Sequence, residues 1–308
     1  MFTLFFAGRE YAPKAIINGV NIQDFLQDHY LGALQYLAQR IHQAGDLEDS
    51  TVIGWESINE PSVGLVGYTD LNIVMSSQQL RKNTCPSAFQ CMLLGEGIAT
   101  KVEVYDWTSL GPQKQGTRLI DPKGQKAWLS SDEFDKKYGW QRDPNWKLGE
   151  CIWAQHGVWD VQSRSLLRPN YFLLNGNGEE VNNDVWLNDF FMIHFKRYAE
   201  TIRSVHTKAI MFLQPPVMFN PPILKAETRD GRLVFSPHYY DGLTLMLKKW
   251  CLQPQTLLKS GIGGILTPLV MCEESTKIQC LQSVLVTMPF AIVYGISLLL
   301  PKTKALKI

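Results

Sequence analysis

The segment 52–61, Val-Ile-Gly-Trp-Glu-Ser-Ile-Asn-Glu-Pro, constrains the fold more than any other part of this chain. β-Branched and aromatic residues fill its first half, and no helical repeat of apolar residues fits it. We therefore expect a short buried strand that a proline stops. Because Pro61 disfavours the α-helical region for the residue before it, we expect the backbone to remain extended up to Glu60.

Asn59 and Glu60 stand at the carboxyl end of this expected strand. A (β/α)8 barrel keeps its chemistry at that end of its strands, so a carboxylate there is a candidate acid or base. An adjacent amide can bond a sugar hydroxyl, and the pair therefore indicates the acid/base site of a glycosidase. The alternative is a charged loop residue that follows a strand.

The flanking segments indicate that strands and helices alternate. We expect strands at 2–7, 52–60, 209–214 and 233–240, and helices at 24–43 and 187–205. Gly45 follows the first helix as a stop signal. The alternation predicts parallel strands in an α/β fold. His194 lies on the apolar stripe of the second helix, and we expect it to be a packed core residue rather than a ligand.

Residues 62–185 form an unusually long interval between the second strand and the second helix. Connections of this kind normally have about 2–6 residues, and long ones on the catalytic face of a barrel shape the substrate cleft. The interval contains Trp107, Trp128, Trp140, Trp146, Trp153 and Trp159. We expect it to form a pocket wall in which tryptophans stack on a sugar or cover a sterol or lipid tail. The alternative for each single tryptophan is packing within the protein.

Composition argues against several classes of partner. The chain has 308 residues, 45% of them hydrophobic and 19% charged, and its net charge of +1 gives no electrostatic case for nucleic acid. None of its six cysteines forms a Cys-x-x-Cys pair, so we expect free thiols and no zinc site. There is no Asn-x-Ser/Thr sequon, and the start lacks the basic region of a signal peptide, so we expect a cytoplasmic protein.

Residues 54–61, Gly-Trp-Glu-Ser-Ile-Asn-Glu-Pro, resemble glycoside hydrolase family 5. In finer detail the chain resembles the fungal subfamily 12, whose members cleave glucose from sterols or ceramide. Further matching blocks follow at 6–14, 21–26, 110–114, 121–124, 146–153, 156–160, 212–216 and 236–244. The resemblance covers about residues 2–250, and this many motifs in one order make it specific.

The resemblance implies an incomplete (β/α)8 TIM barrel over residues 1–250, comprising about strands three to six and interrupted by the insertion 62–185. Segment 2–7 would be the third barrel strand. The first two and last two strands, and the β-sandwich that usually follows them, have no counterpart in the sequence. An open piece of barrel leaves strand edges uncovered, so we expect a fragment that is inactive alone.

The resemblance also implies a retaining β-glucosidase that acts by double displacement on a glucosylated lipid, either a steryl glucoside or a glucosylceramide. Glu60 would be the acid/base, which requires burial or a partner carboxylate to raise its pKa. Asn59 would bond the sugar 2-hydroxyl, His238 would bind sugar or tune the carboxylates, and Tyr240 would orient the nucleophile. The alternative for His238 and Tyr240 is a polar pair at the barrel mouth, and a β-glucan hydrolase is the weaker enzyme alternative. Two carboxylates and water suffice, so no metal, organic cofactor or protein partner is implied.

The nucleophile is not identified, because the resemblance stops after Trp250. Glu273 and Glu274 follow an apolar run and are the sequence candidates, although no glycine motif surrounds them. The divergent tail 251–308 contains an apolar segment, 282–300, whose length is close to that of a membrane span. A buried helix–strand pair and translated non-coding sequence are the alternatives for that segment. The second hypothesis for function is a non-catalytic glycoside hydrolase remnant, or a glycolipid-binding protein that contacts a membrane surface.

Overall fold

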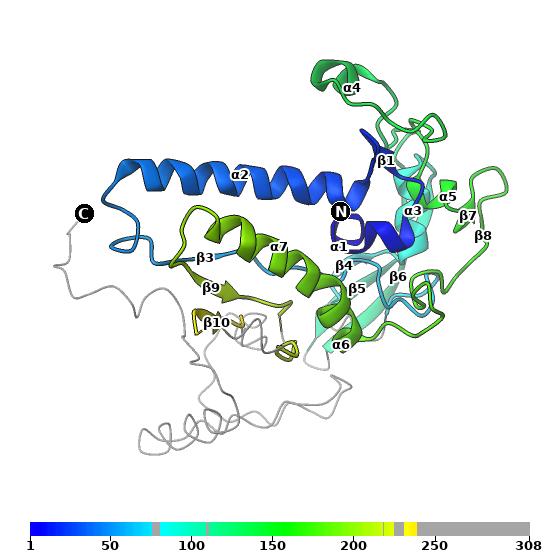
Figure 1. Cartoon of the computed structure of the whole chain (residues 1–308). Helices are drawn as coiled ribbons and strands as arrows, with labels where there is room; N and C mark the ends of the chain where they lie inside the picture. The colour runs from blue at the N-terminus through cyan, green and yellow to red at the C-terminus, as the bar shows by residue number, and fades with distance from the viewer. Residues whose placement is uncertain (76–80, 109–110, 218, 225–230, 239–308) are drawn as a thin grey trace, which may run out of the picture. The chain divides into compact units, whose positions relative to one another are not determined.

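The computed structural model of the chain describes residues 1–75, 81–108, 111–217, 219–224 and 231–238 (Figure 1). These residues fall into two compact units. Unit 1 comprises residues 1–29 and 63–186, and the described part of unit 2 comprises residues 30–62 and 187–238.

A three-stranded parallel sheet lies at the centre of unit 2. Its strands are β3 (Gly54–Glu56), β9 (Ile210–Leu213) and β10 (Leu233–Phe235), in the order β10-β9-β3. In the register Trp55 pairs with Met211, and Met211 pairs with Leu233. The expectation of parallel strands in these three segments is therefore confirmed, although each strand is shorter than expected. Parallel strands place their carboxyl ends at one edge of the sheet, where residues from distant segments meet.

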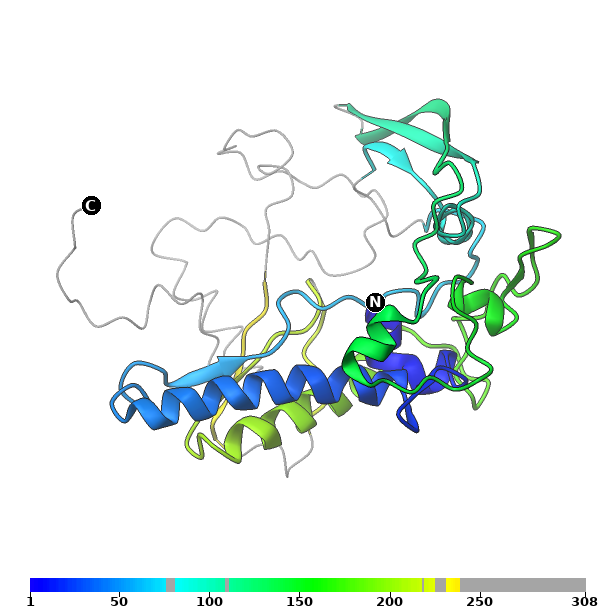
Figure 2. The ribbon, with the colours of Figure 1, turned by 90° about the horizontal axis from the view of Figure 1, so that it is seen from above.

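Two helices accompany this sheet. Helix α2 (Ile22–Ala44) confirms the expected first helix and ends at Gly45, which has φ +84° and donates its N–H to the carbonyl of His42 at 3.1 Å. The expected second helix is divided into α6 (Asn183–Val185), a π-helix η1 (Trp186–Phe191) and α7 (Met192–Arg203). Within unit 2, α2 and α7 lie side by side (Figures 1 and 2), and Gln35 Nε2 donates to Ser204 Oγ at 3.2 Å.

Segment 2–7, expected as a strand, is instead the beginning of helix α1 (Phe2–Tyr11), so the prediction of a third barrel strand there is wrong. A short apolar run has no periodicity that separates strand from helix, and tertiary contacts decide. Phe2 and Phe6 stack at the i, i+4 spacing of a helix, and the Phe6 ring meets Trp186 edge-on with ring centroids 5.3 Å apart. Gln27 Nε2 donates to the Phe5 carbonyl at 2.8 Å.

The rest of unit 1 is more regular than the expected long loop. An antiparallel sheet has the order β4 (Asn83–Cys85), β5 (Thr100–Thr108), β6 (Gly111–Ile120), and it is visible in Figure 2. The other elements are β1 (Ile16–Ile17), β2 (Val20–Asn21), α3 (Ala88–Gly95), α4 (Glu133–Tyr138), α5 (Ile152–Gln155), β7 (Trp159–Asp160) and β8 (Ser165–Leu166). Trp153 and Trp159 are buried in this unit, which agrees with the packing alternative for these two residues. The other expected wall tryptophans are half-buried.

Several residues of the sequence analysis lie outside the described part of the chain. They are Tyr240, Glu273, Glu274, the tail 251–308 and its apolar segment 282–300. Among the described residues, no helix combines the length and the apolar character that crossing a membrane requires.

Candidate active site

Pro61 led us to expect an extended backbone up to Glu60, and this prediction is wrong. Strand β3 ends at Glu56, and Glu60 has a φ of +47°, in the left-handed region that glycine favours. The turn aims the Glu60 N–H at Gln214 Oε1, which accepts it at 3.1 Å. A non-glycine residue held in this region costs about 1–3 kcal/mol, and such strain concentrates at functional sites. The strained backbone conformation of Glu60 therefore favours a functional role for this residue.

The structure brings Glu60 and His238 together. Nδ1 of His238 lies 3.0 Å from Oε1 of Glu60, and both side chains are about one-third exposed. His238 follows β10 and Glu60 follows β3, and these are the two outer strands of the sheet. Asn59 is exposed to solvent beside them. Glu60 and His238 thus meet at the carboxyl edge of the parallel sheet, and Asn59 directly precedes Glu60 in the chain.

A second carboxylate, Glu56, faces the same histidine and was missed from the sequence. Its Oε1 lies 3.9 Å from Nε2 of His238, and its Oε2 accepts a hydrogen bond from the Ser236 hydroxyl at 3.3 Å. Burial raises the pKa of Glu56, and the nearby His238 and the Ser236 hydrogen bond oppose that rise. The signal in the sequence was an ionisable residue inside an otherwise apolar strand.

Gln214 is the other site residue that sequence reasoning missed. It directly follows β9 and is only 3% exposed, and its Oε1 holds the Glu60 backbone. Within the described part of the chain, its Nε2 has no hydrogen-bond partner. A buried donor left in this state costs about 1–3 kcal/mol. Burying the Gln214 amide thus costs stability, and the same side chain holds the backbone of Glu60, the expected acid.

A buried polar cluster lies behind Glu56. His194 on α7 is fully buried, and its Nε2 lies 2.8 Å from Ser57 Oγ, which also bonds the Tyr30 hydroxyl. Burial lowers the pKa of His194 to about 3, so the ring is neutral at physiological pH. Burial likewise raises the pKa of Tyr198, and the charge of Glu56 adds to this effect. The expectation that His194 is a packed core residue is confirmed.

Glu48, Asp49 and His206 form a cluster whose ligand-type atoms lie within 4.8 Å of one another. The hydrogen bonds of His206 account for this cluster without a metal ion. Trp55 Nε1 donates to His206 Nδ1 at 3.0 Å, so the ring proton is on Nε2, which donates to Asp49 Oδ1 at 2.9 Å. A cation at this position would have to displace one of these bonds.

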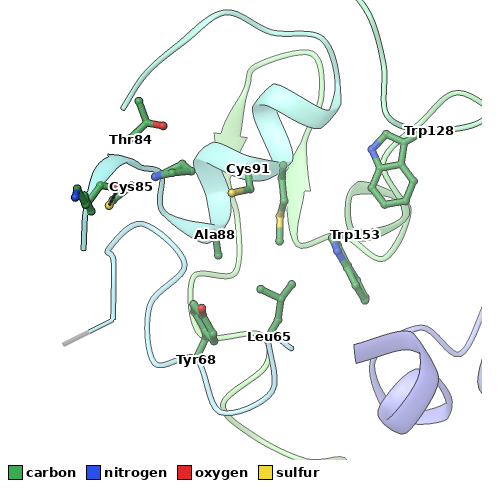
Figure 3. A pocket seen from close by; sticks show the side chains of 11 residues that line it. Leu65, Tyr68, Thr84, Cys85, Ala88, Cys91, Trp128 and Trp153 are labelled. Atoms are coloured by element: carbon green, nitrogen blue, oxygen red, sulfur yellow. Dashed lines mark hydrogen bonds between the residues drawn. The ribbon is translucent and has the colours of Figure 1, made fainter. Parts of the chain in front are cut away.

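Unit 1 contains a cavity of about 520 Å³ whose lining differs from that of the carboxylate site. Figure 3 shows Ala88 and Cys91 on one side of this cavity and Leu65 and Tyr68 facing them, with Trp128 and Trp153 at one end. No aspartate or glutamate is among the described residues that line it. Three described cysteines, Cys85, Cys91 and Cys151, are free thiols. The cavity therefore lacks the groups needed for glycoside hydrolysis.

Comparison with known proteins gives the site a context. The chain is 52% identical over 252 residues to a glucosylceramidase of Aspergillus fumigatus, and 40% identical over 259 residues to an ergosteryl-beta-glucosidase of Saccharomyces cerevisiae. Each alignment covers 81% of this chain and 33% of the relative. The crystal structure of Cryptococcus neoformans sterylglucosidase 1 with tris matches with a TM-score of 0.76 and 47% identity, over 81% of this chain and 35% of that one. No family model matches the sequence.

These relatives share a class of chemistry in their names, because each is a glycosidase. The similarity therefore indicates a glycosidase, and the mixed α/β structure of the chain agrees with the solved sterylglucosidase. The chain spans about one third of the length of these relatives. It is thus similar to a part of fungal enzymes that are named for glucosylated lipids.

Proposed function

We propose that this chain is part of a retaining β-glucosidase that acts on a glucosylated lipid, either a steryl glucoside or a glucosylceramide. The observation that carries the proposal is the contact of Glu60 Oε1 with His238 Nδ1 at 3.0 Å, at the carboxyl edge of a parallel sheet. The substrate class rests on the names of the relatives. The resemblance to glycoside hydrolase family 5 supports the stereochemical class.

The fold proposed for the complete enzyme is a (β/α)8 barrel. Strands β3, β9 and β10 pair in parallel in the order in which they occur along the chain, and α7 lies between β3 and β9 in sequence. This is the arrangement of successive strands in such a barrel. The insertion 62–185 is the proposed wall of the substrate pocket.

In the proposed mechanism Glu60 first donates a proton to the glycosidic oxygen and then takes a proton from water. Asn59 is exposed beside it and bonds the sugar 2-hydroxyl, while His238 orients the Glu60 carboxyl group. The nucleophile lies beyond the described residues, where Glu273 and Glu274 are the sequence candidates and Tyr240 would orient it. Two carboxyl groups about 5–5.5 Å apart are needed for retention.

The test is hydrolysis of glucosylceramide, ergosteryl glucoside and 4-nitrophenyl β-glucoside by the 308-residue chain, its Glu60→Gln variant and a Glu200→Gln control. Glu200 is an exposed residue of α7, so its loss should leave activity unchanged. The chain is expected to be inactive alone, so the comparison applies to any rate that it does show: Glu60→Gln should lower that rate by about 10²–10⁴-fold, the usual contribution of an acid/base group. The loss should be smaller on a dinitrophenyl glucoside, whose leaving group needs no proton.

Measurable hydrolysis at the same rate in the wild type and in Glu60→Gln would contradict the acid/base role. Binding of ergosteryl glucoside or glucosylceramide without hydrolysis would favour the glycolipid-binding hypothesis for this chain. Absence of hydrolysis agrees with the expectation that the fragment is inactive alone, and absence of binding as well would reject the glycolipid-binding hypothesis.

A further inference from the structure

The His238 ring lies between two carboxylates, one at each ring nitrogen. Nδ1 is 3.0 Å from Glu60 Oε1, and Nε2 is 3.9 Å from Glu56 Oε1. The neutral ring has one N–H and one acceptor nitrogen, so the environment of one nitrogen determines the state of the other. The charge of Glu56 at one ring nitrogen can therefore determine whether the other nitrogen donates a hydrogen bond to Glu60 or accepts one from it.

We propose that Glu56 is a positioning residue that holds the proton of His238 on Nε2, so that Nδ1 accepts a hydrogen bond from the protonated carboxyl group of Glu60. This proposal rests on the proposed function, since it assigns how the acid keeps its proton. A carboxylate attracts an N–H and repels a lone pair, so the charge of Glu56 favours the proton on the nitrogen that faces it.

The groups around Glu56 fit this role. The Ser236 hydroxyl donates to its Oε2 at 3.3 Å, which orients the carboxylate from the same strand segment that carries His238. Helix α7 contributes Tyr198, a buried phenol whose pKa is raised by burial and by the charge of Glu56. The titratable groups that face His238 in the described part of the chain are thus Glu56 and Glu60, and behind Glu56 lies Tyr198.

The arrangement has a consequence for catalysis. A general acid must hold its proton at the working pH and release it in the transition state. If the His238 proton were on Nδ1, that N–H would donate to Glu60 and stabilise its ionised carboxylate. Glu60 would then lack the proton that a general acid must donate. With the proton on Nε2, Nδ1 is an acceptor, and only the protonated form of Glu60 can bond it.

The experiment is ¹⁵N NMR of the full 308-residue chain with labelled histidine, in which the tautomer of each ring is read from its two nitrogen shifts. The chain has six histidines, and the His238 signals are those missing in His238→Gln. We expect Nε2 protonated and Nδ1 unprotonated at neutral pH in the wild type. A proton on Nδ1, or on both nitrogens, overturns the proposal without any variant of Glu56.

Variants of Glu56 then test the cause. In Glu56→Gln we expect the Nδ1 shift to move toward its protonated value, and Glu56→Asp should restore much of the wild-type pattern. Glu200→Gln removes an exposed charge from α7 and should leave the His238 signals unchanged. An unchanged tautomer in a folded Glu56→Gln protein overturns the proposal. The nitrogen shifts are measured without substrate turnover. A failure of this proposal can therefore be distinguished from a failure of the proposed function, which the hydrolysis assay with Glu60→Gln tests.

Discussion

Nδ1 of His238 and Oε1 of Glu60 lie 3.0 Å apart although 178 positions separate the two residues in the sequence. The contact reaches across β9, the central strand of the parallel sheet in unit 2. It forms because β3 and β10 run parallel toward the same edge of the sheet, and Glu60 and His238 each follow one of these strands. The site is therefore a product of the topology and cannot form from either segment alone.

The first prediction concerns the strained backbone of Glu60. Its φ of +47° favours glycine, so Glu60→Gly should be more stable than Glu60→Ala by about 1 kcal/mol. The same pair at Glu200, inside helix α7, should differ in the opposite direction by about 1 kcal/mol. Urea denaturation of the four variants measures both differences. Alanine that is as stable as glycine at position 60 would contradict the strain.

The second prediction compares two glycines of unit 2. A methyl group on Gly54 would meet the Ile210 carbonyl oxygen and would lie 2.7 Å from Phe212 Cε2, so Gly54→Ala should separate β3 from β9. We expect a loss of about 1–3 kcal/mol in the free energy of unfolding.

Gly32 is the matched control, because a methyl group there has open space within helix α2. Gly32→Ala should raise the free energy of unfolding by up to about 1 kcal/mol. Thermal denaturation should therefore move the two melting temperatures in opposite directions. A Gly54→Ala protein as stable as the wild type would contradict the close approach of β9.

Local sequence patterns predicted the parallel strands well and the first element badly. Apolar residues closed by prolines marked β9, and alternation with helices indicated that its neighbours run parallel. The segment 2–7 has an equally apolar pattern but forms a helix, since its bonds go to Gln27 and its ring contacts to Trp186. Those contacts come from distant residues, and a short apolar run does not reveal them.

The candidate site was predictable where a residue ends an expected strand or belongs to a family motif. Asn59 and Glu60 were predicted from the strand that ends before Pro61, His238 was predicted from the family resemblance, and the structure brings Glu60 and His238 together. Gln214 could not be found, because its bond to the Glu60 N–H depends on a backbone turn. Pro61 indicated the opposite conformation at that position, since a proline normally favours an extended residue before it.

The third prediction concerns the pair of Trp55 and His206. Trp55→Phe removes the indole N–H that donates to His206 Nδ1. The buried nitrogen loses this hydrogen bond, which should lower the free energy of unfolding by about 1–3 kcal/mol. Zinc should leave the melting temperature of the wild type unchanged, because Nδ1 is an acceptor and Nε2 carries the proton. In Trp55→Phe the ring proton is no longer held on Nε2, so Nε2 can become the ligand atom that zinc needs beside Asp49 and Glu48. Stabilisation of the wild type by zinc would contradict the hydrogen-bond assignment.

The last prediction is a pH dependence from His194. Its pKa of about 3 in the folded chain is lower than the ordinary value of 6.5, so between these values the unfolded chain binds more protons. Stability should therefore be fully present above about pH 6.5, and it should fall as the pH drops toward 3. One group contributes about 1.4 kcal/mol per pH unit, which amounts to about 2 kcal/mol between pH 6.5 and pH 5.

His194→Gln removes this titration and retains an amide that can bond Ser57. The free energy of unfolding, measured in urea at pH 7 and pH 5, should fall about 2 kcal/mol less in the variant than in the wild type. Parallel losses in His194→Gln and the wild type would show that His194 takes up its proton in the folded chain. The ring would then be accessible to solvent, contrary to its position behind Glu56.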